Sequence, residues 1–311
     1  MDFFVDNIIE QFDIDQLKSI LNDMSIVAWD RRMEPSRLSR WLNNFDGHIL
    51  GNKSVEQTLA AWILMNFTFY TENEVRALCK CIFDEYIHIK LIEYKNTNTL
   101  NNHSYVDKIN HIIDNTLFFP LGNPSESGTS ILYYFRQENM LSKKHFEPQT
   151  NKIYENVVYI DDVTISGSQA ANYINNISVK GIKKYILMLI STDETNDYFI
   201  KVLPEHMLIS AIVLDKRSKC FSDDTFCFSG SNSSKLKAFA FKMCEGYGKE
   251  LFNKSPLGFD NGQYIFGFYY NTPDNTLPII WCQNEKWESA FRRYDKIYNR
   301  GEVNIHESKY L

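Results

Sequence analysis

Two adjacent aspartates, Asp161 and Asp162, stand between an apolar run, Val157 to Ile160, and a stretch of small residues. Two neighbouring carboxylates can accept hydrogen bonds from the vicinal hydroxyls of a ribose, or hold a magnesium ion beside them. We therefore predict that Asp161 and Asp162 bind a sugar, with Mg²⁺ as the metal shared between them and the ribose.

The stretch after the aspartates is typical of a loop that binds a phosphate. It consists of Val163, Thr164, Ile165, Ser166, Gly167 and Ser168, and a segment with helical spacing follows from Gln169 to Ile177. Backbone N–H groups at a helix N-terminus converge on an anion, and the helix dipole adds positive potential. The hydroxyls supply further donors, and glycine lets the backbone approach closely. The pattern predicts one compact element that binds both ends of a phosphorylated ribose.

A second stretch repeats the order of strand, small-residue loop and helix. Leu117 to Leu121 is an apolar run, GNPSESGTS follows it, and ILYYFRQENM has helical spacing. Such a loop is either a second anion-binding element or an ordinary helix cap.

These loops need a sheet to position them. Short apolar runs, the later ones rich in β-branched residues, alternate with helical stretches, and they lie at Leu117 to Leu121, Val157 to Ile160, Tyr185 to Ile190 and Leu208 to Leu214. Strands that are apolar on both faces suit a mainly parallel sheet with helices on both faces. The fold class is therefore α/β, and ligands of such sheets bind at the carboxyl ends of the strands.

The residues before this sheet predict an α-helical N-terminal domain. Apolar residues between Asp13 and Asn96 recur at helical spacing. Ser54 with Gln57 and Thr71 with Glu74 have the spacing of capping boxes. The polar segment TNTLNNHS, residues 97–104, is expected to be a connector, which gives a helical domain over 1–104 and an α/β domain over 105–311. Within the latter, residues 262–282 are expected to form two extended runs, joined as a hairpin or hood.

The aspartate segment resembles the signature of type I phosphoribosyltransferases. In that signature a hydrophobic strand is followed by two acids, a hydrophobic residue and a loop rich in Thr, Ser and Gly. The loop here departs from the family at Gln169, where Thr or Ser is usual, so Ser168 is expected to replace it. The resemblance implies phosphoribosyl pyrophosphate (PRPP) or a nucleotide as ligand and Mg²⁺ as cofactor.

The same resemblance implies a pyrophosphate site in the second loop. Its candidate residues are Ser125, Glu126, Ser127, Gly128 and Thr129. Arg136 is expected to assist them, because negative charge develops on a departing pyrophosphate.

A more specific resemblance covers nearly the whole chain. SESGTSILYYFR, the aspartate loop and the distal NTPDNTLPIIW together resemble phosphoribosyltransferase-like proteins of bacterial conflict and antiphage loci. Some of those proteins are encoded beside retron reverse transcriptases. This resemblance implies an effector that acts on nucleotides and is held inactive by a reverse transcriptase bound to its own DNA product.

Three function classes stay open at this point. The first is an enzyme that joins a base to PRPP or cleaves the glycosidic bond of a nucleotide. The second is a sensor that binds such a ligand without turnover. The third is an interaction subunit that docks a nucleoprotein through the arginine-rich face formed by Arg31, Arg32, Arg37 and Arg40.

Composition limits the partners and the cellular location that can be expected. The formal net charge of −6 argues against a chain-wide footprint for nucleic acid or anionic lipid. The six cysteines form no CxxC pair, and no apolar stretch reaches the roughly 18 residues of a membrane helix. We expect a cytoplasmic protein with free thiols and no membrane partner, with oligomerisation left open.

Overall fold

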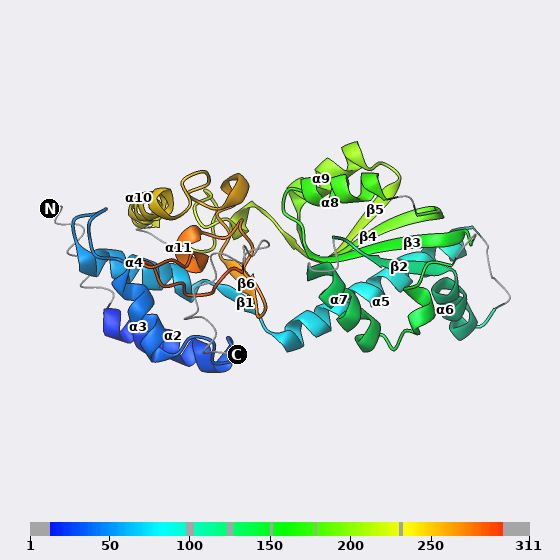
Figure 1. Ribbon diagram of the computed structural model, residues 1–311, viewed down its shortest axis with the longest axis horizontal. Helices are drawn as coiled ribbons and strands as arrows, with labels where there is room; N and C mark the ends of the chain where they lie inside the picture. The colour runs from blue at the N-terminus through cyan, green and yellow to red at the C-terminus, as the bar shows by residue number, and fades with distance from the viewer. Residues whose placement is uncertain are drawn as a thin grey trace. The chain divides into compact units, whose positions relative to one another are not determined.

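The structure is a computed structural model, and it describes residues 13–97, 103–122, 127–149, 152–177, 179–229 and 233–294. These residues form two compact units. One unit contains residues 13–69 and 233–294, and the other contains residues 70–229. Figure 1 shows the elements of both.

The second unit contains the predicted parallel sheet. Its strands are hydrogen-bonded in the order β2-β3-β4-β5, and each neighbouring pair is parallel. They span Thr116–Pro120 (β2), Tyr154–Val163 (β3), Gly181–Thr192 (β4) and His206–Leu214 (β5). All four apolar runs are therefore strands, and the predicted α/β class is confirmed.

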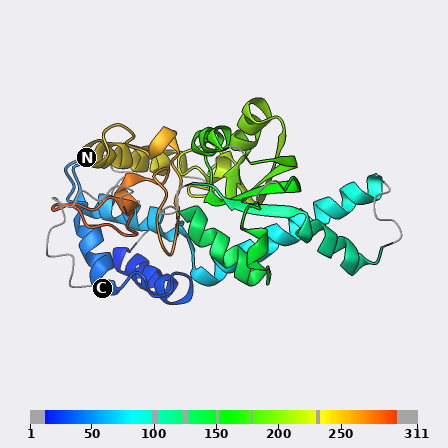
Figure 2. The same ribbon diagram turned by 45° about the vertical axis from the view of Figure 1, so that its right-hand side comes forward.

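Helices cover both faces of this sheet (Figures 1 and 2). Helices α8 (Ser168–Asn176) and α9 (Asp193–Val202) lie on one face, and α5 (Glu72–Asn96) and α7 (Ser127–Glu138) lie on the other. Side chains of a strand alternate between its faces. On β3, Val157 and Tyr159 accordingly join the apolar core beneath α8 and α9. The short helix α6 (Tyr105–Asp114) precedes β2.

The first unit is mostly helical. Its longer helices are α2 (Ile14–Val27), α3 (Pro35–Asn43), α4 (Lys53–Met65) and α10 (Ser233–Leu251). Strands β1 (Thr68–Tyr70) and β6 (Phe266–Phe268) pair with each other, and α11 (Pro278–Trp281) follows. An aromatic cluster fills the core, in which Phe67 stacks on Phe291 with ring centroids 4.4 Å apart.

Single-turn 3₁₀ helices complete the described elements. They span Lys143–His145 (η1), Lys216–Ser218 (η2) and Phe259–Asn261 (η3).

Two local predictions are corrected by the structure. Of the two extended runs expected over 262–282, the first contains β6, but the second is wrong, because Pro278 stands at the first position of α11 and begins a helical turn there. The hairpin is therefore wrong, and the alternative of a hood stays a prediction. The capping box at Ser54 is also wrong, since Asn52 caps α4 by accepting the N–H of Val55. The capping box of Thr71 and Glu74 is confirmed at the start of α5.

The predicted domain boundary after residue 104 stays a prediction. The compact units are defined by packing, which does not by itself establish which segment folds independently. In the structure, α5 packs with the sheet: the Tyr86 hydroxyl lies 2.9 Å from Thr116 Oγ1 of β2. Most of the expected connector at 97–104 lies outside the described residues.

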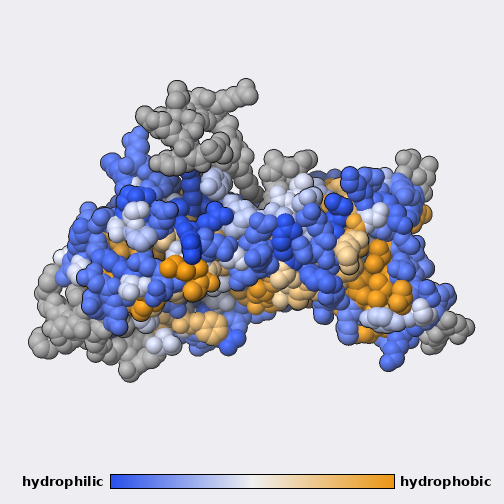
Figure 3. Space-filling model, turned by 90° about the horizontal axis from the view of Figure 1, so that it is seen from below, coloured by the Kyte–Doolittle hydropathy of each residue, from blue (hydrophilic) through white to orange (hydrophobic). Residues whose placement is uncertain are grey.

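The surface seen in Figure 3 is largely hydrophilic, with several apolar patches. Across the part of the chain that the structure describes, no helix combines the length and the apolar character needed to cross a membrane.

Candidate functional site

The two aspartates occupy the carboxyl end of β3, as expected. Asp161 lies opposite Met188 of β4 and is half-buried, whereas Asp162 is only 6% exposed. Asp161 Oδ1 accepts the N–H of Asp162 at 2.9 Å, and Asp162 Oδ1 accepts the N–H of Val163 at 2.8 Å. These bonds to the next residue's backbone orient both carboxylates at the edge where parallel sheets bind ligands.

The phosphate loop, which we define as Thr164 to Ser168, turns directly into α8. Gly167 is the N-cap of this helix and adopts the left-handed conformation, with φ 75°. A Cβ at this position would lie 2.6 Å from Phe199 Cε1 and 2.9 Å from Tyr198 Cδ1. Glycine is therefore required here both for the backbone conformation and for the close packing of α9.

The phosphate loop carries four consecutive N–H groups that have no intramolecular acceptor among the described residues. Thr164 still bonds to the Ile190 carbonyl at 3.0 Å and so continues the sheet. The N–H groups of Ile165, Ser166, Gly167 and Ser168 make no such bond. Unpaired donors at a helix N-terminus are typical of loops that bind an anion.

Two hydroxyls lie in the same loop as these N–H groups. Ser166 Oγ and Ser168 Oγ lie 3.0 Å apart, so they point into the same region. One of them donates to the other, so the second O–H adds to the N–H groups one donor of the kind that a phosphate accepts.

The start of helix α7 lies beside the aspartates at the end of the sheet. Helix α7 begins at Ser127, inside the stretch predicted as the second loop, because Ser127 to Ser130 form its first turn. A Cβ on its buried Gly128 would lie 2.2 Å from the Leu121 carbonyl oxygen. The same Cβ would lie 3.2 Å from Asp161 Oδ1. The start of α7 and the aspartates are therefore in close contact, although they are about thirty residues apart in the sequence.

Not every predicted pyrophosphate residue can be placed. Thr129 is exposed in the first turn of α7, and Ser127 is the first residue of that helix. Ser125 and Glu126 lie outside the described residues.

Arg136 is not brought to the two loops. It lies in the last turn of α7, and its guanidinium stands 5.8 Å from the Tyr133 ring centroid. Eight residues separate it from Gly128, which is roughly 12 Å along a helix axis.

Two threonines of α9 also belong to the site, and sequence reasoning missed them. Thr192 is the N-cap of α9, and its hydroxyl donates to the Ile165 carbonyl at 2.9 Å. The Thr195 hydroxyl contacts the same carbonyl. The signal was present in STDET, where a polar cap follows the apolar run of β4.

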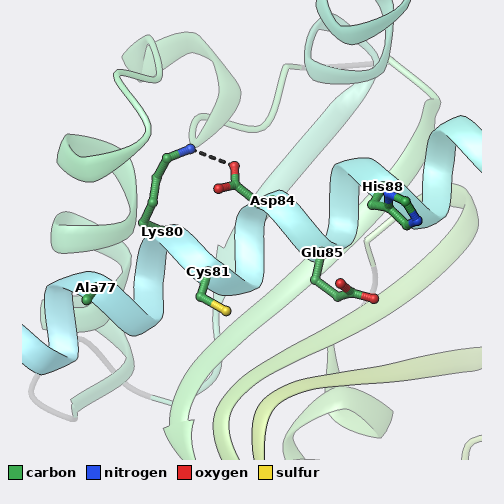
Figure 4. Close-up of a pocket in the computed structure, with 6 residues that line it drawn as sticks. All are labelled: Ala77, Lys80, Cys81, Asp84, Glu85 and His88. Carbon is green, nitrogen blue, oxygen red and sulfur yellow. Dashed lines mark hydrogen bonds and ion pairs between the residues drawn. The ribbon is translucent and has the colours of Figure 1, made fainter.

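A separate hollow of 550 Å³ lies along the outer face of α5 (Figure 4). The residues that line it come from this one helix: Ala77, Lys80, Cys81, Asp84, Glu85 and His88. Lys80 and Asp84 form an ion pair across one helical turn. None of these residues belongs to the two loops, so the hollow does not mark the candidate site.

The aspartates suit a metal that takes most of its ligands from elsewhere. No group of three or more His, Cys, Asp or Glu in the described ranges could hold a metal ion. Mg²⁺ is commonly bound by only one or two carboxylates together with substrate phosphates and water. Asp161 and Asp162 fit that pattern.

The protein has a four-stranded parallel sheet with helices on both faces, and an acidic pair precedes the loop at the end of β3. This combination is that of an α/β protein of the phosphoribosyltransferase type. The PRTase-CE family model matches residues 38–293, which is most of the chain. The chain therefore belongs to the PRTase-CE family.

Comparison with solved structures gives weak similarities to two related proteins. The UMP synthase of Leishmania donovani is 14% identical, with a TM-score of 0.29, over 45% of this chain and 27% of that one. The orotate phosphoribosyltransferase of Aeropyrum pernix is 12% identical, with a TM-score of 0.23, over 35% of this chain and 72% of that one. The chain thus spans about a quarter of the length of the UMP synthase. No curated protein matches the sequence.

Proposed function

We propose that the protein binds PRPP or a nucleotide and acts at the anomeric carbon of its ribose. The observation that carries this proposal is the set of four N–H groups, Ile165 to Ser168, that have no acceptor among the residues the structure describes, next to the carboxylates of Asp161 and Asp162. A phosphate needs donors and ribose hydroxyls need acceptors, and both stand at the end of one strand.

Each part of the site has a role in this proposal. The phosphate loop holds the 5′-phosphate, while Asp161 and Asp162 orient the ribose hydroxyls. Asp161 and Asp162 would hold Mg²⁺, whose chemistry there would be to neutralise charge on the phosphates. The start of α7 at Gly128 would bind the pyrophosphate. Its contact with Asp161 supports this role, because pyrophosphate and ribose are joined in PRPP.

Two reactions are consistent with this site. In one, the bond between C1 and the pyrophosphate oxygen breaks, a base nitrogen bonds to C1, and pyrophosphate leaves. In the other, the bond between C1 and the base breaks, and water supplies the new oxygen. Both pass through an oxocarbenium-like state that carboxylates and a fixed ribose stabilise.

The biological setting is part of the proposal, and the motif resemblance supports it. We propose an effector of antiphage defence, controlled by a reverse transcriptase bound to its DNA product. On the arginine-rich face, Arg31, Arg32 and Arg40 are exposed, while Arg37 donates to the Ser289 carbonyl. A nucleoprotein bound there would dissociate steeply with rising salt, which a binding titration would measure.

The experiment that tests the chemistry is mass spectrometry after incubation with Mg²⁺, PRPP, bases and a mixture of ribo- and deoxynucleotides. The variant carries Asp161→Asn and Asp162→Asn, and a control carries Asp84→Asn on the outer face of α5. We expect the wild type and the control to make or break a nucleotide and the double variant to fail.

Other outcomes separate the remaining classes. Binding of PRPP without any product, lost in the double variant, would make the protein a sensor. A wild type that binds neither PRPP nor a nucleotide would contradict the proposal, and an interaction subunit would then be the better description.

A further inference from the structure

Two threonine hydroxyls in the first turn of α9 hold the back of the phosphate loop. Thr192 is 1% exposed and Thr195 is fully buried. Thr192 Oγ1 donates to the Ile165 carbonyl at 2.9 Å, and Thr195 Oγ1 contacts the carbonyls of Ile165 and, at 3.3 Å, Thr164. The loop carbonyls therefore face α9.

The hydrogen atoms in this cluster can be assigned consistently. A carbonyl oxygen has two lone pairs, so the Ile165 carbonyl can accept from both hydroxyls at once. Thr192 Oγ1 in turn accepts the N–H of Thr195 at 3.0 Å, which is the capping bond of α9. Both threonine hydroxyls of this cluster are hydrogen-bonded, and such satisfied networks hold one geometry.

Fixing a carbonyl also fixes the N–H on the other side of the same peptide bond. In a trans peptide the C=O and the following N–H point in opposite directions. Because the Thr164 and Ile165 carbonyls face α9, the N–H groups of Ile165 and Ser166 face away from it. These are two of the four N–H groups that have no acceptor in the described part of the chain.

We infer that Thr192 and Thr195 are positioning residues that direct the phosphate-loop N–H groups toward the 5′-phosphate. This inference rests on the proposed function for the identity of the ligand. Preorganised donors bind an anion without the cost of ordering the loop at the moment of binding. Neither threonine touches the ligand in this arrangement, so both act through the peptide bonds of the loop.

Thr195 gives the cleaner test. Replacing Thr192 would also remove the cap of α9, whereas Thr195→Val removes one hydroxyl at nearly constant volume. Thr195→Ser keeps the hydroxyl and serves as the rescue. Thr58→Val is the matched control, because Thr58 is buried in the other unit and its hydroxyl has no partner within the described chain.

The first measurement is calorimetric titration of the full chain with ribose 5-phosphate. We expect Thr195→Val to weaken binding about tenfold, as the loss of one to two oriented N–H groups implies. Thr195→Ser and Thr58→Val should stay within about twofold of the wild type. If Thr195→Val, folded as judged by its melting temperature, binds like the wild type, the inference is overturned.

The second measurement needs no ligand. We expect the ¹⁵N relaxation order parameter of the Ser166 amide to fall in Thr195→Val and to keep its wild-type value in Thr195→Ser and Thr58→Val. An unchanged order parameter in Thr195→Val overturns the inference. If the wild type does not bind ribose 5-phosphate but this amide still responds, the proposed function fails while the positioning role holds.

Discussion

Two loops of this molecule present clusters of backbone N–H groups, and only one of them satisfies these groups internally. In the first unit, the fully buried carboxylate of Glu56 accepts from Gly47 at 2.7 Å, Ile49 at 3.0 Å and Leu50 at 2.6 Å. The Tyr247 hydroxyl donates to the same carboxylate. In the second unit, the N–H groups of Ile165 to Ser168 in the phosphate loop find no acceptor within the described residues.

This difference distinguishes a loop whose N–H groups stabilise the fold from a loop whose N–H groups are available to a ligand. A carboxylate and a phosphate both offer charged oxygens to N–H donors. In the first unit the Glu56 side chain supplies that anion, so the loop binds a group of its own chain. The phosphate loop has comparable N–H donors at the carboxyl end of the parallel strands, where such sheets bind ligands. Those of Ile165 to Ser168 have no acceptor in the described part of the chain. The contrast predicts that changes in the first loop cost stability, while changes in the second mainly cost ligand binding.

The largest effect is expected for Glu56→Ala. The substitution would leave three N–H groups and the Tyr247 hydroxyl without their acceptor in a buried region, at a cost of roughly 3–5 kcal/mol of unfolding free energy. Urea denaturation would measure it, with the exposed Glu85→Ala as the control. A loss below about 1 kcal/mol would mean that the Glu56 loop is satisfied by other means.

The next effect is expected for Gly167→Ala in the phosphate loop. The left-handed backbone costs about 1 kcal/mol for alanine, and the contact with Phe199 adds to it. We expect roughly 2–3 kcal/mol of lost stability together with loss of ribose 5-phosphate binding.

Gly51→Ala provides the matched control for this substitution. Gly51 also has a positive φ, of 81°, but a Cβ there would meet no atom within 4 Å. Only the backbone cost of about 1 kcal/mol should appear at Gly51. Equal losses at the two positions would show that packing against α9 contributes nothing.

A third effect concerns the dependence of stability on pH, and it tests whether unpaired polar atoms such as those of His206 by themselves indicate a binding site. Both ring nitrogens of His206, at the start of β5, are buried without a hydrogen-bond partner in the described chain. Burial lowers the pKa of His206 to about 4, assisted by Lys184 and opposed by Glu205. This histidine stands at the amino end of its strand, away from the edge that binds ligands in such folds.

The sign of the pH effect follows from that pKa. Between pH 6.5 and about 4 the unfolded chain binds a proton that the folded protein excludes, so stability falls as the pH falls through this range. We expect His206→Gln to reduce this loss by an amount on the order of 2 kcal/mol. Denaturation at pH 7 and pH 4.5 would show it. A pH profile identical to that of the wild type would contradict the assignment.

The smallest effect is expected for Arg136→Ala. Because Arg136 lies at the far end of α7 from Gly128, the affinity for PRPP should change by less than about twofold. A tenfold loss of affinity for PRPP would mean that Arg136 does bind the pyrophosphate, as predicted from the sequence. A change at Gly128, by contrast, would disturb the contact with Asp161.

The spacing of apolar residues and the order of polar ones predicted most of the strands and helices of the second unit. The four apolar runs became the four strands. The central strands β3 and β4 are buried on both faces along most of their length and so must be apolar there, whereas in the edge strand β5 only Ile209 is buried. The aspartates and the glycine of the phosphate loop could be placed from local order, since strand, turn and helix follow each other directly between Tyr154 and Asn176.

The parts that could not be predicted depend on contacts distant in sequence. Nothing local to Glu56 shows that its carboxylate is enclosed by Gly47 and Tyr247, and nothing local to Thr195 shows that it reaches the Ile165 carbonyl. The segment at Pro278 was misjudged because its apolar residues suit a strand as well as a buried helical turn.

The cysteines of this chain have a practical consequence for spectroscopy. Five of them are buried, and burial raises the pKa of Cys79 to about 12, so its thiol is poorly reactive. Cys81 alone is exposed, on the outer face of α5 (Figure 4). A maleimide dye should therefore attach to the wild-type protein at one known position. The label would report on the second unit without any substitution near the phosphate loop.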